Sequence, residues 1–106
     1  MFSYGVSRTV QPVSPVTGDT VQLNPGDTDD ILLILTPAGT LANLEVDFPN
    51  DGDTILGQNV LVFTSRTITN FTMGNATTIL NAPNTLLSNS ISMFVKVAAN
   101  TWCGNT

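Results

Sequence analysis

Residues 58–102 read QNVLVFTSRTITNFTMGNATTILNAPNTLLSNSISMFVKVAANTW, and this stretch decides the fold. It consists of short apolar runs, each interrupted by Gly, Asn, Pro or Ser. Its clearest part is residues 90–97, where every second residue is apolar (Ile91, Met93, Val95 and Val97). A period of two over eight residues predicts a β-strand that buries one face, here the apolar series.

The upstream chain repeats this organisation. Residues 31–35 (ILLIL) and 60–63 (VLVF) are apolar throughout and too short for a helix, so both are predicted to be strands covered on both faces. In residues 44–48 the apolar positions should face the core and Glu45 and Asp47 should face water. Further short strands are expected at 20–23, 67–73, 77–80 and 101–103. No amphipathic helix is visible.

Short strands at about the 8–12-residue spacing of sandwiches and barrels predict an all-β fold. We expect a two-sheet β-sandwich of jelly-roll or related topology. A single domain should span residues 15–106. Residues 1–14 are predicted to be an extended N-terminal arm or an edge strand, because strand-like alternation there meets Pro12 and Pro15. An arm would anchor Phe2 and Tyr4 on a neighbouring subunit.

The composition points to an assembly rather than to a free enzyme. Only 10% of the 106 residues are charged, against about 25% in typical soluble domains. Such a surface suits a protein that is covered by partners. The net charge is −5 with three Lys and Arg residues, which argues against binding to nucleic acid or to an anionic membrane.

Residues that usually carry catalysis are sparse. The chain has no histidine, which removes the usual general base and the Ser-His and Cys-His nucleophile systems. We therefore expect no enzyme activity, no cofactor and no metal site. The single cysteine, Cys103, is interpreted as a small, partly buried apolar residue.

Two acidic clusters could instead be explained by turn chemistry or by a structural cation. The first consists of Asp27, Asp29 and Asp30, and the second of Asp47, Asp51 and Asp53. The second cluster does not fit an EF-hand register, so turn chemistry is favoured for both. Glu45 and Asp47 could form the carboxylate pair of a glycosidase, but without an aromatic-lined cleft the pair is interpreted as a solvated strand face.

The strand pattern resembles a recurring β-module of tailed-bacteriophage virion proteins. The likeness covers roughly residues 31–103 and rests on ILLILTPAGT, LEVDFP, GQNVLVF, TITNFTM and SISMFVKVAANTW, in this order. The resemblance implies a structural virion protein, usually a homotrimer. It allows two places in the particle, namely a capsid decoration (cement) protein and a receptor-binding or tail-fibre tip.

The short chain, which carries no shaft or attachment region, favours decoration. We expect it to be made in the host cytoplasm and to lie on the capsid exterior, where it bridges copies of the major capsid protein through buried apolar area and strand addition. The residues expected at its interfaces are Phe2, Tyr4, Val6, Phe94 and Trp102.

Overall fold

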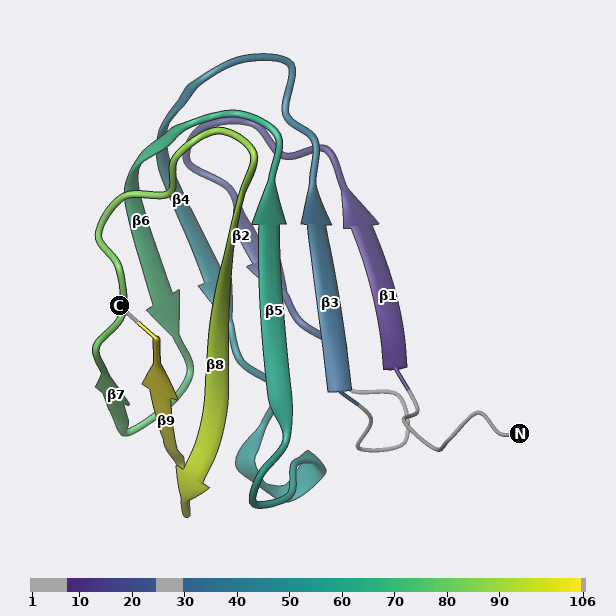
Figure 1. Cartoon of the computed structure of the whole chain (residues 1–106), viewed down its shortest axis with the longest axis vertical. Helices are drawn as coiled ribbons and strands as arrows, with labels where there is room; N and C mark the ends of the chain where they lie inside the picture. The colour runs from purple at the N-terminus through teal and green to yellow at the C-terminus, as the bar shows by residue number, and fades with distance from the viewer. Residues whose placement is uncertain (1–7, 25–29, 106) are drawn as a thin grey trace.

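The computed structural model describes residues 8–24 and 30–105, which fold into two facing β-sheets (Figure 1). The strands are β1 (Arg8–Val13), β2 (Thr20–Gln22), β3 (Asp30–Leu35), β4 (Leu41–Asp47), β5 (Asn59–Thr64), β6 (Ile68–Gly74), β7 (Thr78–Leu80), β8 (Ser90–Ala98) and β9 (Thr101–Gly104). A short 3-10 turn, η1 (Asp51–Asp53), precedes β5. No α-helix occurs in these two ranges.

From β1 to β6 the chain passes back and forth between the two sheets. Sheet A has the order β1-β3-β5-β8-β9-β7, and sheet B has the order β2-β4-β6. In this part of the chain, two successive strands of one sheet are separated in sequence by one strand of the other sheet. Strands β1, β3 and β5 therefore run in the same direction through sheet A and pair in parallel. The strands of sheet B do the same. The result is a stack of coils similar to a β-solenoid.

The all-β class is confirmed, but the strand pairing differs from the predicted jelly roll. Strands of a jelly roll pair antiparallel, whereas among the named strands of the described chain only β8 pairs in that way, with β5 and with β9. Parallel pairing requires a long crossover connection, and the intervening strand in the other sheet supplies it. Residues 8–13 form edge strand β1, and residues 1–7 lie outside the described part of the chain.

The core lies between the two sheets and is built from alternate residues of their strands. Ile31, Leu33 and Leu35 of β3 are fully buried, as are Val60 and Val62 of β5. Sheet B contributes an apolar series that includes the predicted inward residues of β4 (Leu44, Val46 and the following Phe48).

Three aromatic side chains close the end of the core next to β8 and β9. Phe48 stacks on Trp102 with ring centroids 4.3 Å apart and contacts the edge of Phe94 at 5.5 Å. This cluster joins sheet B to the C-terminal strands, so it ties the stack of coils to the strands that terminate it.

Asparagine forms several of the tight connections. Asn75 follows β6, Asn89 precedes β8, and Asn100 joins β8 to β9, all with positive φ values. Asparagine tolerates this left-handed conformation better than most residues. Asn75 and Asn100 thus form these connections in a backbone conformation that few other residues accept.

Candidate interaction surfaces

The outer face of sheet A carries an apolar surface that residues 8–24 and 30–105 leave uncovered. Two cross-strand rows run over β1, β3, β5 and β8, with side chains directed away from the core. The first row is Val10, Leu32, Leu61 and Met93. The second row is Pro12, Ile34, Phe63 and Ile91. We call these eight residues the apolar face.

The apolar face is most exposed to solvent along the two strands that border it, β1 and β8. Val10 on β1 is 55% exposed and Ile91 on β8 is 58% exposed. Leu32 and Leu61 on the central strands are half-buried because their neighbours in the row flank them. Val95 and Val97 extend the apolar character further along β8. A contiguous apolar surface of this kind marks a site of contact with another molecule.

Polar residues border the apolar face at the start of β1, β3 and β5. Arg8 and Asp30 are cross-strand partners there. Asn59 follows in the same row, and its backbone N–H and side-chain amide donate to the two carboxylate oxygens of Asp30 at 3.0 and 3.3 Å. This border gives the surface the arrangement of a protein interface, with an apolar centre and a polar rim.

The orientation of β8 is the reverse of the prediction. Ile91, Met93 and Val97 are exposed, while Phe94 and Lys96 are buried. Phe94 pairs with the buried Val60, which fixes the inward face of the strand. The apolar alternation in this strand therefore faces outward and not into the core of its own domain.

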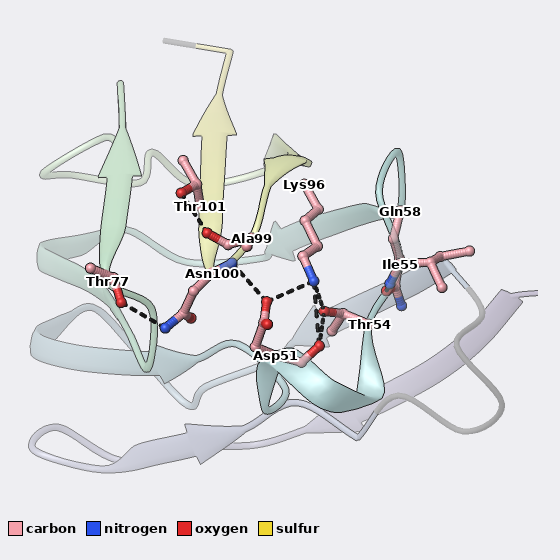
Figure 2. A network of polar contacts seen from close by, with 9 residues as sticks. All are labelled: Asp51, Thr54, Ile55, Gln58, Thr77, Lys96, Ala99, Asn100 and Thr101. Atoms are coloured by element: carbon pink, nitrogen blue, oxygen red, sulfur yellow. Dashed lines mark hydrogen bonds and ion pairs between the residues drawn. The ribbon is translucent and has the colours of Figure 1, made fainter.

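A polar network makes the burial of Lys96 possible (Figure 2). Its Nζ lies 2.7 Å from Asp51 Oδ1, donates to the Asp51 carbonyl at 3.3 Å, and donates to Thr54 Oγ1. Asp51 Oδ1 also accepts the backbone N–H of Asn100 at 2.7 Å. The hydrogen bonds from Lys96 and Asn100 lower the pKa of Asp51 below its ordinary value. The network fastens η1 to the β8–β9 turn and serves structure.

Sheet B presents a different surface, because its outer face is polar and carries a shallow groove. The groove has a volume of about 220 Å³ and crosses all three strands. Its lining residues are Gly18, Asp19, Thr20, Asn43, Leu44, Glu45, Asn70 and Thr72. The stacked pair Asn43 and Asn70 lies in register in adjacent coils.

Two carboxylates converge at one end of this face. Glu45 and Asp47 point to the same side of β4, as predicted, and fold over Gly74 of β6. A Cβ atom on residue 74 would lie 2.5 Å from Asp47 Oδ1 and 2.7 Å from Glu45 Oε2. The hydrogen bond with Asp47, together with repulsion between the two charges, raises the pKa of Glu45 above its ordinary value of 4.5.

Asp47→Asn should stabilise the protein at neutral pH. A carboxyl group with a raised folded pKa favours folding at low pH, and this contribution is lost as pH rises from 4.5 through the raised value. The variant replaces the repelling partner with an amide that can donate to Glu45. We expect a gain below about 1 kcal/mol at neutral pH, since both groups are partly exposed. Urea unfolding across this pH range measures it.

Asp53→Asn is the matched control for this prediction. It removes the same charge from η1, where the residue is exposed and away from Gly74. Equal gains for the two variants would attribute the effect to net charge and contradict the pairing of Glu45 with Asp47.

The open edge of β1 is poorly suited to strand addition. Thr36 N–H donates to the Val13 carbonyl at 2.9 Å, so the Val13 peptide faces β3 and, by alternation, Pro12 faces the open side. Proline has no N–H to offer there. Gln11 bridges from β1 to the chain around β2, since Nε2 donates to the Gln22 carbonyl and Oε1 accepts from Asn24 N–H. Contact through the face is therefore favoured over contact through this edge.

The residues predicted at an interface lie elsewhere. Phe94 and Trp102 are 0% and 2% exposed and belong to the core, so neither side chain is available to a partner. Both side chains instead pack against Phe48 in the aromatic cluster. Phe2, Tyr4 and Val6 lie outside the described residues.

One described member of each acidic cluster makes structural contacts. Asp30 binds Asn59, and Asp51 binds Lys96 and Asn100. Asp27 and Asp29 lie outside the described residues. Within residues 8–24 and 30–105, no three His, Cys, Asp or Glu side chains gather as a metal site would require. Cys103 is a free, half-buried thiol.

Sequence reasoning missed the apolar face, although its signal was present. The runs at residues 31–35 and 60–63 are apolar on both sides and were predicted to be covered on both. The structure covers only one side of each, so the other side supplies Leu32, Ile34, Leu61 and Phe63 to the surface. A strand that is apolar on both sides, in a two-layered arrangement such as the one described, is the signal for an apolar outer face.

In comparisons with known proteins, no family model, curated protein or solved structure matches this chain. In the described residues, no helix has the length and apolar character needed to span a membrane.

Proposed function

We propose that this chain is a structural protein of a tailed-bacteriophage virion, placed on the capsid exterior as a decoration protein. The observation that carries a contact function is the apolar face, which crosses four strands of sheet A and is not covered by any other described part of the chain. The likeness of residues 31–103 to phage virion modules supplies the virion setting. On this proposal the protein acts by contact with the major capsid protein and with its own copies, and catalyses no reaction.

The charge distribution supports a position on an outer surface. Glu45 and Asp47 lie on the outer face of sheet B, on the opposite side of the molecule from the apolar face. A copy whose sheet A is covered by a contact keeps these acidic groups exposed on its other side. Acidic outer surfaces keep particles apart in solution.

Quantitative mass spectrometry of purified phage particles that encode this chain tests the proposal. Hundreds of copies per particle are expected for a protein that repeats over a shell with the symmetry of the capsid. A tail location would give about a dozen copies or fewer, since tails have low cyclic symmetry. Absence of the chain from particles would overturn the proposed function.

The polar groove on sheet B favours one second candidate, a receptor-binding or tail-fibre tip. Hydroxyl, amide and carboxylate groups from three strands converge there, and such groups suit a polar ligand on a cell surface. This candidate predicts that the isolated protein adsorbs to host cells and blocks infection. A decoration protein would bind particles and leave infection by free phage unchanged.

A further inference from the structure

We propose that the occupant of the apolar face is a second copy of this chain, packed sheet A against sheet A about a two-fold axis. The pairing goes beyond the proposed function: it assigns the apolar face to a second copy, in place of the homotrimer that the virion resemblance implies, and leaves the contact with the capsid to other surfaces. A two-fold contact uses the same surface on both copies, so the surface must be complementary to itself. Two rows of aliphatic and aromatic side chains without a charge meet this requirement.

The distribution of charge selects this face for self-association. A chain with a net charge of −5 repels its own copies. Among the described carboxylates, Glu45, Asp47 and Asp19 lie on or beside sheet B, and Asp51 and Asp53 lie in η1. The outer face of sheet A bears only Asp30, which has Arg8 as its cross-strand partner. Two copies that approach through the outer faces of their A sheets therefore keep most of the described carboxylates apart.

The dimensions of the molecule suit a stable pair. It is a slab with extents of 37 × 33 × 21 Å, and sheet A lies parallel to its broad face (Figure 1). Standard interfaces bury about 800 Å² per partner, with an apolar centre inside a polar rim. The broad face is large enough for this area, the eight apolar residues form its centre, and the row from Arg8 to Asn59 forms part of the rim.

The edges of sheet A direct copies toward face-to-face contact. Pro12 removes an outward donor from β1, and β7 at the other edge has only three residues. Facing sheets instead pack about 10 Å apart through interdigitated side chains, which needs no free backbone groups. Such a pair would have four layers, with sheet A of each copy inside and sheet B outside.

Light scattering coupled to size-exclusion chromatography of the full chain tests the pairing. The wild type is expected at twice the chain mass of 11.2 kDa. The double variant Ile91→Thr, Met93→Thr should run as the monomer, with its dissociation constant raised at least tenfold, about the effect of losing two apolar side chains from an interface. Threonine keeps the β-propensity of strand β8, so circular dichroism should remain that of the wild type.

The matched control is Val16→Thr, Leu87→Thr. These residues are 64% and 66% exposed but lie outside the apolar face, so this variant should stay paired. Should the β8 variant fail to fold, Val10→Thr on β1 tests the same surface from its other border. A monomeric or trimeric wild type, or a pair that survives both the β8 and the β1 substitutions, would overturn the inference.

These outcomes separate the pairing from the proposed function. A monomer that is abundant in purified particles would reject the pair and leave the decoration role intact. A two-fold pair in solution that is absent from particles would retain the pair and reject that role.

Discussion

Trp102→Ala is expected to remove about 3–5 kcal/mol of stability, the usual result of truncating a large buried aromatic residue. Trp102 is 2% exposed and stacks on Phe48 at 4.3 Å, so its removal opens a cavity between sheet B and the closing strand β9. Single domains are stable by about 5–15 kcal/mol in total, so the loss is a large part of the whole. Urea unfolding followed by circular dichroism measures it.

Leu87→Ala is the control for this experiment. Leu87 is 66% exposed, and substitutions at such positions change stability by about 0.5 kcal/mol or less. Trp102→Phe should lie between the two variants, because it keeps an aromatic ring against Phe48. A loss below about 1 kcal/mol for Trp102→Ala would show that the aromatic cluster does not hold the two sheets together.

Gly104→Ala is expected to destabilise the protein by about 1–3 kcal/mol, although it adds one methyl group. A Cβ atom there would lie 2.6 Å from the Asn81 carbonyl oxygen and 3.1 Å from Phe94 Cε2. The carbonyl belongs to a backbone turn with positive φ at Asn81, so it cannot move aside as a flexible side chain would. Thermal and urea unfolding of the variant give the size of the loss.

The opposite sign is expected for Gly39→Ala. A Cβ atom at residue 39 meets nothing within 4 Å, and alanine reduces the conformational freedom of the unfolded chain. Such substitutions stabilise by about 0.4–1 kcal/mol where the backbone accepts them. If both variants changed stability alike, crowding at Asn81 would not be the reason that residue 104 is glycine.

The strands could be predicted from local patterns because each depends on nearby residues. The apolar runs at 31–35 and 60–63 lie within β3 and β5, and the outward positions of Glu45 and Asp47 follow from the period of β4. Pairing direction depends on which strands meet, and this is set by contacts between residues far apart in sequence. No local sequence pattern therefore distinguishes the predicted jelly roll from the parallel pairing that the structure has.

The candidate surface could not be predicted for a related reason. The sequence around β8 offers two plausible inward faces, and Ile91, Met93 and Val95 look more apolar than Phe94 with Lys96. The true choice depends on Asp51, which lies 45 residues before Lys96 and neutralises its charge. A buried lysine is acceptable only with such a partner, and the partner becomes visible only in the folded chain.

Parallel stacking of the coils also sets an order of events during synthesis. Each coil can pair with the one before it as soon as it leaves the ribosome, because β3 adds to β1 and β5 adds to β3. The other edge of β5 remains unpaired until β8 is synthesised about 30 residues later. Strand β8 also brings Phe94 into the core. Until then the nascent chain exposes both an unpaired strand edge and an incomplete interior, the combination that makes partly folded chains aggregate. Strand β8, residues 90–98, thus completes both the sheet and the interior of the newly made chain.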